Sequence, residues 1–287
     1  MGIAGFLNRP QHDTKFLKIV SWNICGCKTK LEKENVEKIL LQYDIVALNE
    51  VKTSLPVYLP GYVSYMSFDK DSSHRGGTTV FLKNYLSHEV VNVDTSIPDQ
   101  VWFKLRIMPK ILFGACYIPP SESPYFSHRE FASLQERLID NNEGDKCLLI
   151  GDLNSRFGKG VRFLNTSNAL SYPYIPDDVT TPNDNAYVLT TICKDHDLVV
   201  INNLKTSSKH FASNKTYKQG NRWVSELDIC VCSQELIDRI DWFRVYQTEN
   251  LPSDHAPIAI QMSKSNTDLD DVVRRASYLG GHASLMG

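Results

Sequence analysis

Short apolar runs separated by turn residues recur along most of the chain and predict many β-strands. Most runs are roughly four to eight residues long, which favours buried strands over helices. Between residues 61 and 117 they are rich in β-branched and aromatic side chains, with Gly, Asn or Pro between them, as in consecutive strands. We expect strands at residues 15–22, 44–48, 62–68, 78–82, 88–93, 101–107, 111–117, 147–150, 198–201, 223–232 and 255–262.

Helices are expected where the apolar spacing changes to three or four residues. The segment 31–43 has one apolar stripe, made of Val36, Ile39, Leu40 and Tyr43. Ser127 followed by Glu130 is a capping box and predicts the start of a second helix. Its inward positions are expected to be Phe131, Leu134, Leu138 and Ile139. Further helices are expected at 185–196 and 233–240, with a loop at 155–184.

This order of elements predicts an α/β fold. Some predicted strands follow one another directly and others are separated by helices. This combination suits a four-layer sandwich, in which two packed, mainly antiparallel mixed sheets are flanked by helices. The 287 residues fit one large domain. We place that domain at residues 15–262, after a flexible arm at 1–14 and before a linker or tail at 263–287.

Composition limits the classes of function. The net charge of −2 gives no overall attraction to nucleic acid, so any DNA contact must be local. The 7 cysteines are an odd number spread over predicted strands and helices, which favours reduced thiols in the cytosol or nucleus. The sequence shows no secretory signal and no apolar run near the roughly 18 residues of a membrane span, so no membrane partner is expected.

Polar side chains that can take part in catalysis or metal binding lie where four apolar runs end or begin. Asn23 follows the first run and Glu50 follows the run at 44–48. Asp152 and Asn154 follow the run at 147–150, and alternate residues of an extended chain point the same way. The tripeptide at 253–255 precedes the last run. Asp and Asn are common in turns, so one such case says little; the four together predict a shared site.

Metal-assisted cleavage of a phosphate ester suits this set. Mg²⁺ takes oxygen ligands, usually one or two protein carboxylates, so Glu50 is the first expected ligand, assisted by Asn23. A second carboxylate, Asp152, can orient and deprotonate a water molecule for in-line attack. His255 can be cationic and stabilise the pentavalent phosphorus. Asp228 is its expected orienting partner, because a carboxylate inside an apolar strand is costly unless it is paired.

Seven short motifs occur in an order that resembles the endonuclease/exonuclease/phosphatase superfamily. The resemblance spans residues 16–262, most of the chain. The motifs are Ser21-Trp22-Asn23, Leu48-Asn49-Glu50, Arg75-Gly76-Gly77, Tyr117-Ile118-Pro119, Gly151-Asp152-Leu153-Asn154, Ser225-Glu226-Leu227-Asp228 and Ser253-Asp254-His255.

The resemblance implies the same metal ligands, base and His–Asp pair, and it adds three roles. Tyr117 and Asn154 would contact the scissile phosphate, and Asp254 would assist the metal or the leaving group. The implied cofactor is Mg²⁺, with Mn²⁺ as a substitute. Leu153 stands where the family usually has Phe, and we expect it to pack in the core.

Within that superfamily the chain looks most like the endonuclease domain of LINE-type non-LTR retrotransposons. Arg156 directly follows Gly-Asp-Leu-Asn-Ser, and the segments 185–204 and 216–225 carry the other cues. This likeness implies double-stranded DNA as a partner, a reverse transcriptase domain in a longer protein, and a nuclear location after synthesis in the cytoplasm.

A basic segment between residues 205 and 222 supports contact with DNA. It has five cations and no acid, with Phe211 and Tyr217 interleaved, and such cations and aromatics bind phosphates and bases. In the retrotransposon enzymes a β-hairpin here reads a DNA groove; the alternative is a solvated loop. The expected DNA-binding residues are Arg75, Arg156, Lys215, Tyr217, Lys218, Arg222 and Ser225.

These features predict a Mg²⁺-dependent DNA endonuclease that nicks one strand. The resemblance implies that the nick leaves a 3′-hydroxyl, which would prime reverse transcription. One alternative is another hydrolase of the same fold: an abasic-site repair nuclease, an RNase or deadenylase, or a phosphoinositide phosphatase. A second alternative is a catalytically silent DNA-binding module, against which the complete set of candidate catalytic residues argues.

Overall fold

The computed structural model describes residues 15–70, 75–127, 129–141, 144–157, 163–164, 170–171, 182–206 and 208–264. The predicted arm at 1–14, nearly all of the tail and most of the loop at 155–184 lie outside the described residues. The proposed domain boundaries therefore stay predictions.

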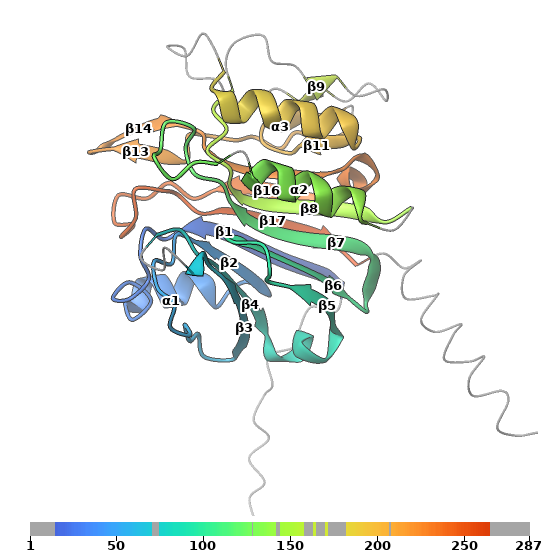
Figure 1. Ribbon diagram of the computed structural model, residues 1–287. Helices are drawn as coiled ribbons and strands as arrows, with labels where there is room; N and C mark the ends of the chain where they lie inside the picture. The colour runs from blue at the N-terminus through green and yellow to red at the C-terminus, as the bar shows by residue number, and fades with distance from the viewer. Residues whose placement is uncertain are drawn as a thin grey trace, which may run out of the picture.

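The first of two six-stranded sheets has the order β16-β17-β1-β2-β4-β3 (Figure 1). The pair β1–β2 is parallel, and the other neighbours are antiparallel. Its strands are β1 (Phe16–Asn23), β2 (Ile45–Asn49), β3 (Tyr62–Ser67), β4 (Thr78–Lys83), β16 (Ile240–Val245) and β17 (Ile258–Ser263).

The second six-stranded sheet has the order β11-β15-β8-β7-β6-β5. Again one pair, β7–β8, is parallel, and the other neighbours are antiparallel. Its strands are β5 (Val90–Asp94), β6 (Gln100–Leu105), β7 (Met108–Tyr117), β8 (Lys146–Asp152), β11 (Leu198–Val200) and β15 (Asp228–Ser233). Smaller elements are β9 (Phe163–Leu164), β10 (Leu170–Ser171), β12 (Leu204–Lys205), β13 (Tyr217–Gln219), β14 (Arg222–Ser225) and the 3₁₀ helix η2 (Asn84–Glu89).

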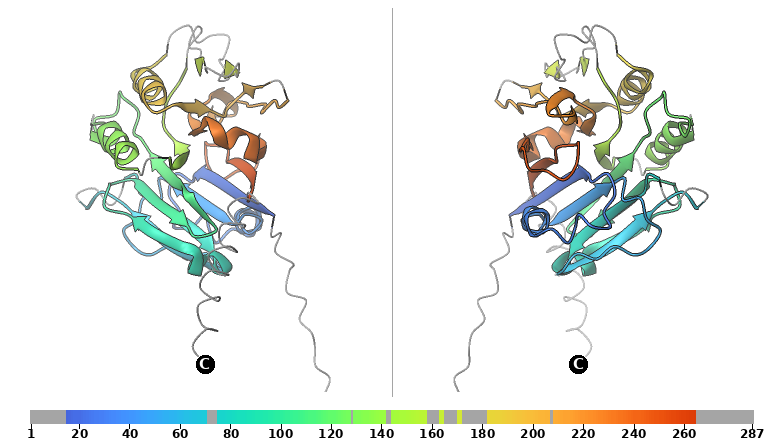
Figure 2. Two further views of the ribbon diagram at one scale, coloured as in Figure 1. Left: turned by 90° about the vertical axis from the view of Figure 1, so that its right-hand side faces the viewer. Right: turned by 90° about the vertical axis from the view of Figure 1, so that its left-hand side faces the viewer.

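Three apolar layers hold the sheets and helices together. Figure 2 shows the helices on the outer sides of the two sheets. The central layer lies between the sheets, where Ile19 and Phe113 belong to one cluster. Helices α2 (Arg129–Ile139) and α3 (Asp184–Asp195) share a second cluster with the outer face of β8. Helix α1 (Glu34–Leu40) shares a third with the outer face of β1. This arrangement confirms the predicted four-layer α/β sandwich.

Strand β8 shows why its sequence is apolar without alternation. Leu148 and Ile150 belong to the central layer, whereas Cys147 and Leu149 pack with the helices on the other face. A strand buried on both faces needs apolar side chains at every position. The predicted strand at 147–150 is therefore correct, and β8 continues to Asp152.

Several predicted elements differ in the structure. The helix predicted at 31–43 is confined to α1, the segment 233–240 forms the 3₁₀ helix η3 (Gln234–Arg239), and the run 223–232 divides into β14 and β15. Strand β16 was not predicted, because a register shift between Ile240 and Trp242 interrupts its alternation. Ile139 is 65% exposed rather than inward, since it is turned about 100° from Leu138 on the helix.

Each of the seven cysteines is a free thiol, and all except Cys25 are buried. Among the described residues, no helix is long and apolar enough to cross a membrane.

Candidate active site

Three neighbouring strands of the second sheet bring a row of polar side chains to one edge. Tyr117 is the last residue of β7 and pairs in register with Asp152, the last residue of β8. Asp152 pairs in turn with Asp228, the first residue of antiparallel β15. The alignment follows from the register, so the pairing of these three strands fixes the row.

The first sheet adds its own polar residues to the same place. Asn23 and Asn49 end the parallel strands β1 and β2 and lie side by side, and Glu50 follows Asn49. The Asn23 Nδ2 donates to Asp152 Oδ2 at 2.8 Å and to Glu50 Oε1 at 3.1 Å. The Asp152 amide donates to Asn49 Oδ1 at 3.2 Å. These bonds lock the two sheets together at the site.

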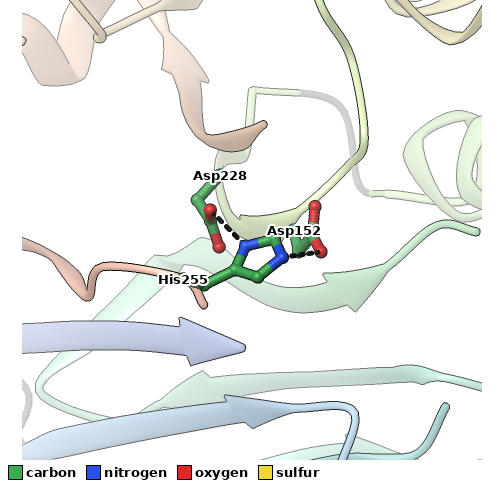
Figure 3. A group of neighbouring side chains, drawn as sticks. All are labelled: Asp152, Asp228 and His255. Carbon is green, nitrogen blue, oxygen red and sulfur yellow. Dashed lines mark hydrogen bonds and ion pairs between the residues drawn. The ribbon is translucent and has the colours of Figure 1, made fainter. Parts of the chain in front are cut away.

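His255 lies between two buried carboxylates (Figure 3). Its Nδ1 is 2.8 Å from Asp228 Oδ2, and its Nε2 is 3.8 Å from Asp152 Oδ2. The ring of Tyr217 is 5.1 Å from the imidazole, centroid to centroid. Asp228, His255 and Asp152 therefore form a buried line, in which a hydrogen bond joins the first two and electrostatic attraction acts between His255 and Asp152.

The backbone around His255 is held by buried hydrogen bonds. Trp22 Nε1 donates to the His255 carbonyl at 2.9 Å. Ser253 Oγ accepts from the His255 amide at 3.1 Å and donates to the Asn23 carbonyl at 2.6 Å. Thr216 Oγ1 accepts from the Asp228 amide at 3.0 Å. Such support keeps the imidazole in one orientation, which catalysis by a positioned group needs.

Burial and nearby charges shift the pKa values of both His255 and Asp152. Burial alone would lower the pKa of His255, but the carboxylates of Asp228 and Asp152 outweigh it and raise that pKa well above its ordinary value. Burial raises the pKa of Asp152, and the nearby imidazole opposes that rise. The geometry thus favours an imidazolium beside a carboxyl group that can exchange protons near neutral pH.

Replacing Asp228 with Asn should lower the pKa of His255. The nearest anion is removed while burial still disfavours the imidazolium, so a fall of roughly 1–3 units is expected. An NMR titration of the His255 ring protons measures this shift. Asp241→Asn, at the far end of β16, removes an exposed acid as a matched control and should change nothing. An unchanged His255 titration in Asp228→Asn would show that Asp228 does not set its charge.

Glu50 is surrounded by groups that keep its carboxylate ionised. Burial would raise its pKa, but Lys52, Asn23 and Tyr117 outweigh burial and lower the pKa. Lys52 Nζ lies 2.6 Å from Glu50 Oε2, and the Tyr117 hydroxyl hydrogen-bonds to the same carboxylate. Lys52 was missed in the sequence, although a cation two residues after a candidate metal ligand was a usable signal.

The oxygen donors at Glu50 fit a hard divalent cation. Glu50 and Asp152 are both bonded to the Asn23 amide, so two carboxylates approach one point from different sheets. Asn23 Oδ1 accepts from the Cys25 amide at 2.9 Å. In this orientation Asn23 positions the carboxylates, and a rotation of its amide would offer its oxygen as a ligand.

A second group of potential metal ligands overlaps with the first. Among the described residues, Asp152, Asp228 and His255 have ligand atoms that all lie within 4.8 Å of one another. His255 Nδ1 is already bonded to Asp228, whose side chain is fully buried. This trio therefore suits proton transfer better than metal binding, and the Glu50 side suits the metal.

Most predicted catalytic residues line one cleft of about 490 Å³. From the predicted sets it contains Glu50, Asp152, Asn154, Asp254, His255, Arg156, Tyr217 and Ser225. Asn23 and Asp228 are buried behind this lining, and Tyr117 lies beside it. Arg75 lines a neighbouring cleft instead. Lys215, Lys218 and Arg222 are not part of either lining.

Asn154 reaches the site by a different backbone path from the one predicted. The chain is not extended beyond Asp152, because Asn154 has a positive φ of 46°. Its amide donates to Asp152 Oδ1 at 3.1 Å, and its Nδ2 donates to the Ile118 carbonyl at 2.9 Å. Leu153 is buried in the core, as expected. Asp152 and Asn154 therefore share the cleft through a turn, not through strand alternation.

A β-hairpin made of β13 and β14 stands beside the cleft and projects from the body of the molecule (Figure 1). Its base is bonded to the loop at residues 253–255, called the catalytic loop, since the Lys218 amide donates to the Asp254 carbonyl at 2.8 Å. Lys218 Nζ lies 5.6 Å from the Trp223 ring, and Arg222 is exposed. The predicted hairpin is present, although it begins only in the later part of the basic segment at residues 205–222.

Two residues of the basic segment have structural roles. Phe211 is 2% exposed and packs in the central core, so it does not face DNA. Lys209 Nζ donates to three backbone carbonyls at the end of η3, those of Ile237, Asp238 and Ile240. Sequence alone did not separate these from the hairpin residues, because both kinds share the same local composition.

The fold is that of known α/β-sandwich nucleases. A 3′-5′ exonuclease from Neisseria meningitidis superposes with a TM-score of 0.63 and 17% identity, covering 86% of this chain and 99% of that one. An AP endonuclease from Leishmania major gives a TM-score of 0.66 and 16% identity, covering 87% and 88%. At such identities these structures establish the fold alone.

The chain belongs to the Endonuclease/Exonuclease/phosphatase family, whose model matches residues 20–255. The members of this family are hydrolytic nucleases and phosphatases that depend on divalent metals. Among curated proteins, the chain is 27% identical over 147 residues to the RNA-directed DNA polymerase from mobile element jockey of Drosophila melanogaster. That match covers 49% of this chain and 15% of the relative, so the chain spans only a small part of that protein's length.

Proposed function

We propose that this chain is a divalent-metal-dependent DNA endonuclease that nicks one strand and leaves a 3′-hydroxyl and a 5′-phosphate. The observation that carries the proposal is the buried Asp228–His255–Asp152 line beside the ionised Glu50 carboxylate. A general base and a metal ligand lie on opposite sides of one amide, that of Asn23. Metal-assisted hydrolysis of a phosphodiester uses this combination.

The chain's own groups can carry the proton movements. Asp152 takes a proton from the attacking water, whose oxygen then becomes part of the 5′-phosphate as the bond from phosphorus to the 3′-oxygen breaks. His255 as imidazolium stabilises the extra negative charge on phosphorus, and Asp228 keeps it protonated. Asp254, in the cleft lining, would assist the departing 3′-oxygen, which takes a proton from water to become the 3′-hydroxyl. A divalent cation, Mg²⁺ or Mn²⁺, held by Glu50 with Asn23 would neutralise charge on the phosphoryl oxygens.

Double-stranded DNA as the substrate is supported by the surroundings of the cleft. Arg156 and Tyr217 line it, and the hairpin beside it carries Lys218 and Arg222. Cations at such positions would bind the phosphates on either side of the cut and would make binding dependent on salt. The local placement of these charges is compatible with the net charge of −2.

The likeness to a mobile-element protein supports a retrotransposon role. The nick would then provide the 3′-hydroxyl from which a reverse transcriptase in a longer protein extends, and the work would take place in the nucleus. A nicked plasmid that a DNA polymerase extends without prior phosphatase treatment would support this end chemistry. Ends that need phosphatase before extension would contradict it.

Supercoiled plasmid incubated with the protein and Mg²⁺ should become open circular, and EDTA should stop the reaction. Glu50→Gln should also weaken Mn²⁺ binding, measured by the loss of free Mn²⁺ signal in electron paramagnetic resonance, by about tenfold or more. Nicking that persists in EDTA would overturn the proposal. Abasic DNA, RNA and phosphoinositides in parallel reactions test the other hydrolases of this fold, and faster turnover of any of them would replace DNA nicking as the function.

A further inference from the structure

The side chain of Lys52 lies against the carboxylate that is proposed to bind the metal. Its Nζ is 2.6 Å from Glu50 Oε2 and 3.5 Å from Cys25 Sγ. Asn23 Nδ2 donates to Glu50 Oε1, so each oxygen of this carboxylate already has a donor. A divalent cation drawn to Glu50 would therefore meet an ammonium group that has the same sign of charge and is bonded to the same carboxylate.

The backbone of Lys52 is held in place, so its side chain is the part that can move. The Lys52 amide donates to the Gly76 carbonyl at 3.0 Å. The neighbouring Val51 amide donates to the Gly77 carbonyl at 3.1 Å, and the Val51 side chain is buried. The side chains of Lys52 and Glu50 both line the catalytic cleft, and they are 37% and 17% exposed. The ammonium can thus leave the carboxylate by rotation of its flexible stem into the cleft.

The charges that line this cleft give the ammonium a second use. The described residues of the lining include four acids, and their positive or titratable groups are Lys52, Arg156 and His255. His255 is already bonded to Asp228. An anionic phosphate in these surroundings needs a cation that is not held by an acid. Lysine ammonium groups bind phosphate oxygens as point charges, so a Lys52 released from Glu50 would meet that need.

We propose that Lys52 exchanges partners as the active site assembles: the divalent cation replaces it on Glu50, and its ammonium moves to an oxygen of the bound DNA phosphate. The inference rests on the proposed function, because it uses the proposed metal site and a phosphodiester substrate. A cation alone must take Lys52 from its anion, whereas a phosphate supplies a new one. Metal and DNA should therefore each raise the affinity for the other, and by linkage the two factors are equal.

The experiment measures Mn²⁺ binding by the loss of free Mn²⁺ signal in electron paramagnetic resonance. The parent protein carries Asp152→Asn, so that a duplex containing a mapped nick site stays intact. Without DNA, addition of Lys52→Met should tighten Mn²⁺ binding about fivefold or more, because the competing cation is gone. With DNA, the parent should gain more Mn²⁺ affinity than the Lys52→Met protein, by about the same factor. A phosphate that also ligates the metal adds equally to both gains, so their difference isolates Lys52.

Lys28→Met is the matched control for the loss of one positive charge. Lys28 is exposed, lies three residues from Cys25 and is not part of the cleft lining. This variant should bind Mn²⁺ as the parent does, with and without DNA. Lys52→Arg keeps a cation beside Glu50, so it should not tighten Mn²⁺ binding in the absence of DNA.

A Lys52→Met protein that binds Mn²⁺ no more tightly than the parent would overturn the inference, and so would an equal gain in Lys28→Met. Nicking by the wild-type protein in Mg²⁺ would in either case leave the proposed function standing. Should Lys52→Met not fold, NMR of the lysine ammonium groups of the parent provides the test. The Lys52 resonance, assigned by its loss in Lys52→Arg, should shift when Mg²⁺ and DNA are added together, and an unchanged resonance would overturn the inference. A wild-type protein that neither binds Mn²⁺ nor nicks DNA would overturn both proposals.

Discussion

Replacing Asp152 with Asn should reduce the rate of DNA nicking by about 10²–10⁴-fold, the usual contribution of a positioned general base. Asn is close to Asp in shape and can still accept the hydrogen bond from the Asn154 amide. It cannot accept a proton from water at neutral pH. The loss should therefore appear in the single-turnover rate at saturating DNA, with little change in the affinity for DNA.

A comparison with His255→Ala tests whether the two residues act as one unit. Groups that act together show strongly non-additive effects, so the double variant should be about as slow as the slower single variant. Asp195→Asn is the matched control, because this exposed acid ends α3 and makes no contact in the cleft lining. Nicking by Asp152→Asn at a rate within about threefold of the wild type would remove Asp152 from its role as the base.

The sequence predicted which polar residues come together wherever an apolar strand ends in such a residue. Glu50, Asp152 and His255 could be grouped because strand ends in an α/β fold gather at one edge, and the structure places all three in one cleft. The pairing of Asp228 with His255 could be predicted because burying an unpaired carboxylate within an apolar strand costs free energy, so the carboxylate needs a partner. These inferences use local pattern and general energetics.

What the sequence left open depends on sheet order and register. The row from Tyr117 through Asp152 to Asp228 exists because β8 lies between β7 and β15 in one particular register, and periodicity does not specify such pairing. The contact between Lys52 and Glu50 and the turn at Asn154 depend on left-handed backbone at strand ends. Positive φ in a non-glycine residue is set by tertiary contacts, so composition does not indicate it.

In the basic segment, the sequence did not distinguish residues with a structural role from residues that could bind a ligand. Lys209 and Lys218 are both cations between neutral residues in the sequence. In the structure Lys209 caps η3 by three carbonyl contacts, and Lys218 lies on the hairpin beside the catalytic loop. A charge pattern therefore marks the region proposed to face DNA, but the role of each charge depends on which backbone groups lie within reach.

Gly151→Ala should destabilise the protein by more than about 3 kcal/mol, beyond the usual cost of overpacking. A Cβ at Gly151 would lie 1.8 Å from the Cys116 carbonyl oxygen, which is backbone and has no alternative rotamer. Cys116 and Gly151 are register partners in the parallel pair β7–β8. Relief of this contact requires the two strands to separate next to Tyr117 and Asp152, so the fold and the site should fail together.

Gly144→Ala separates this contact from the general cost of replacing glycine. A Cβ there would meet no atom within 4 Å, and only its φ of +82° opposes the change, which should cost about 1–2 kcal/mol. Urea denaturation of the two variants measures the difference. Equal stabilities would show that β7 and β8 can move apart at little cost. A Gly151→Ala protein that folds but nicks slowly would instead show that the close approach of these strands places Asp152, since the stability loss and the rate loss would then have separated.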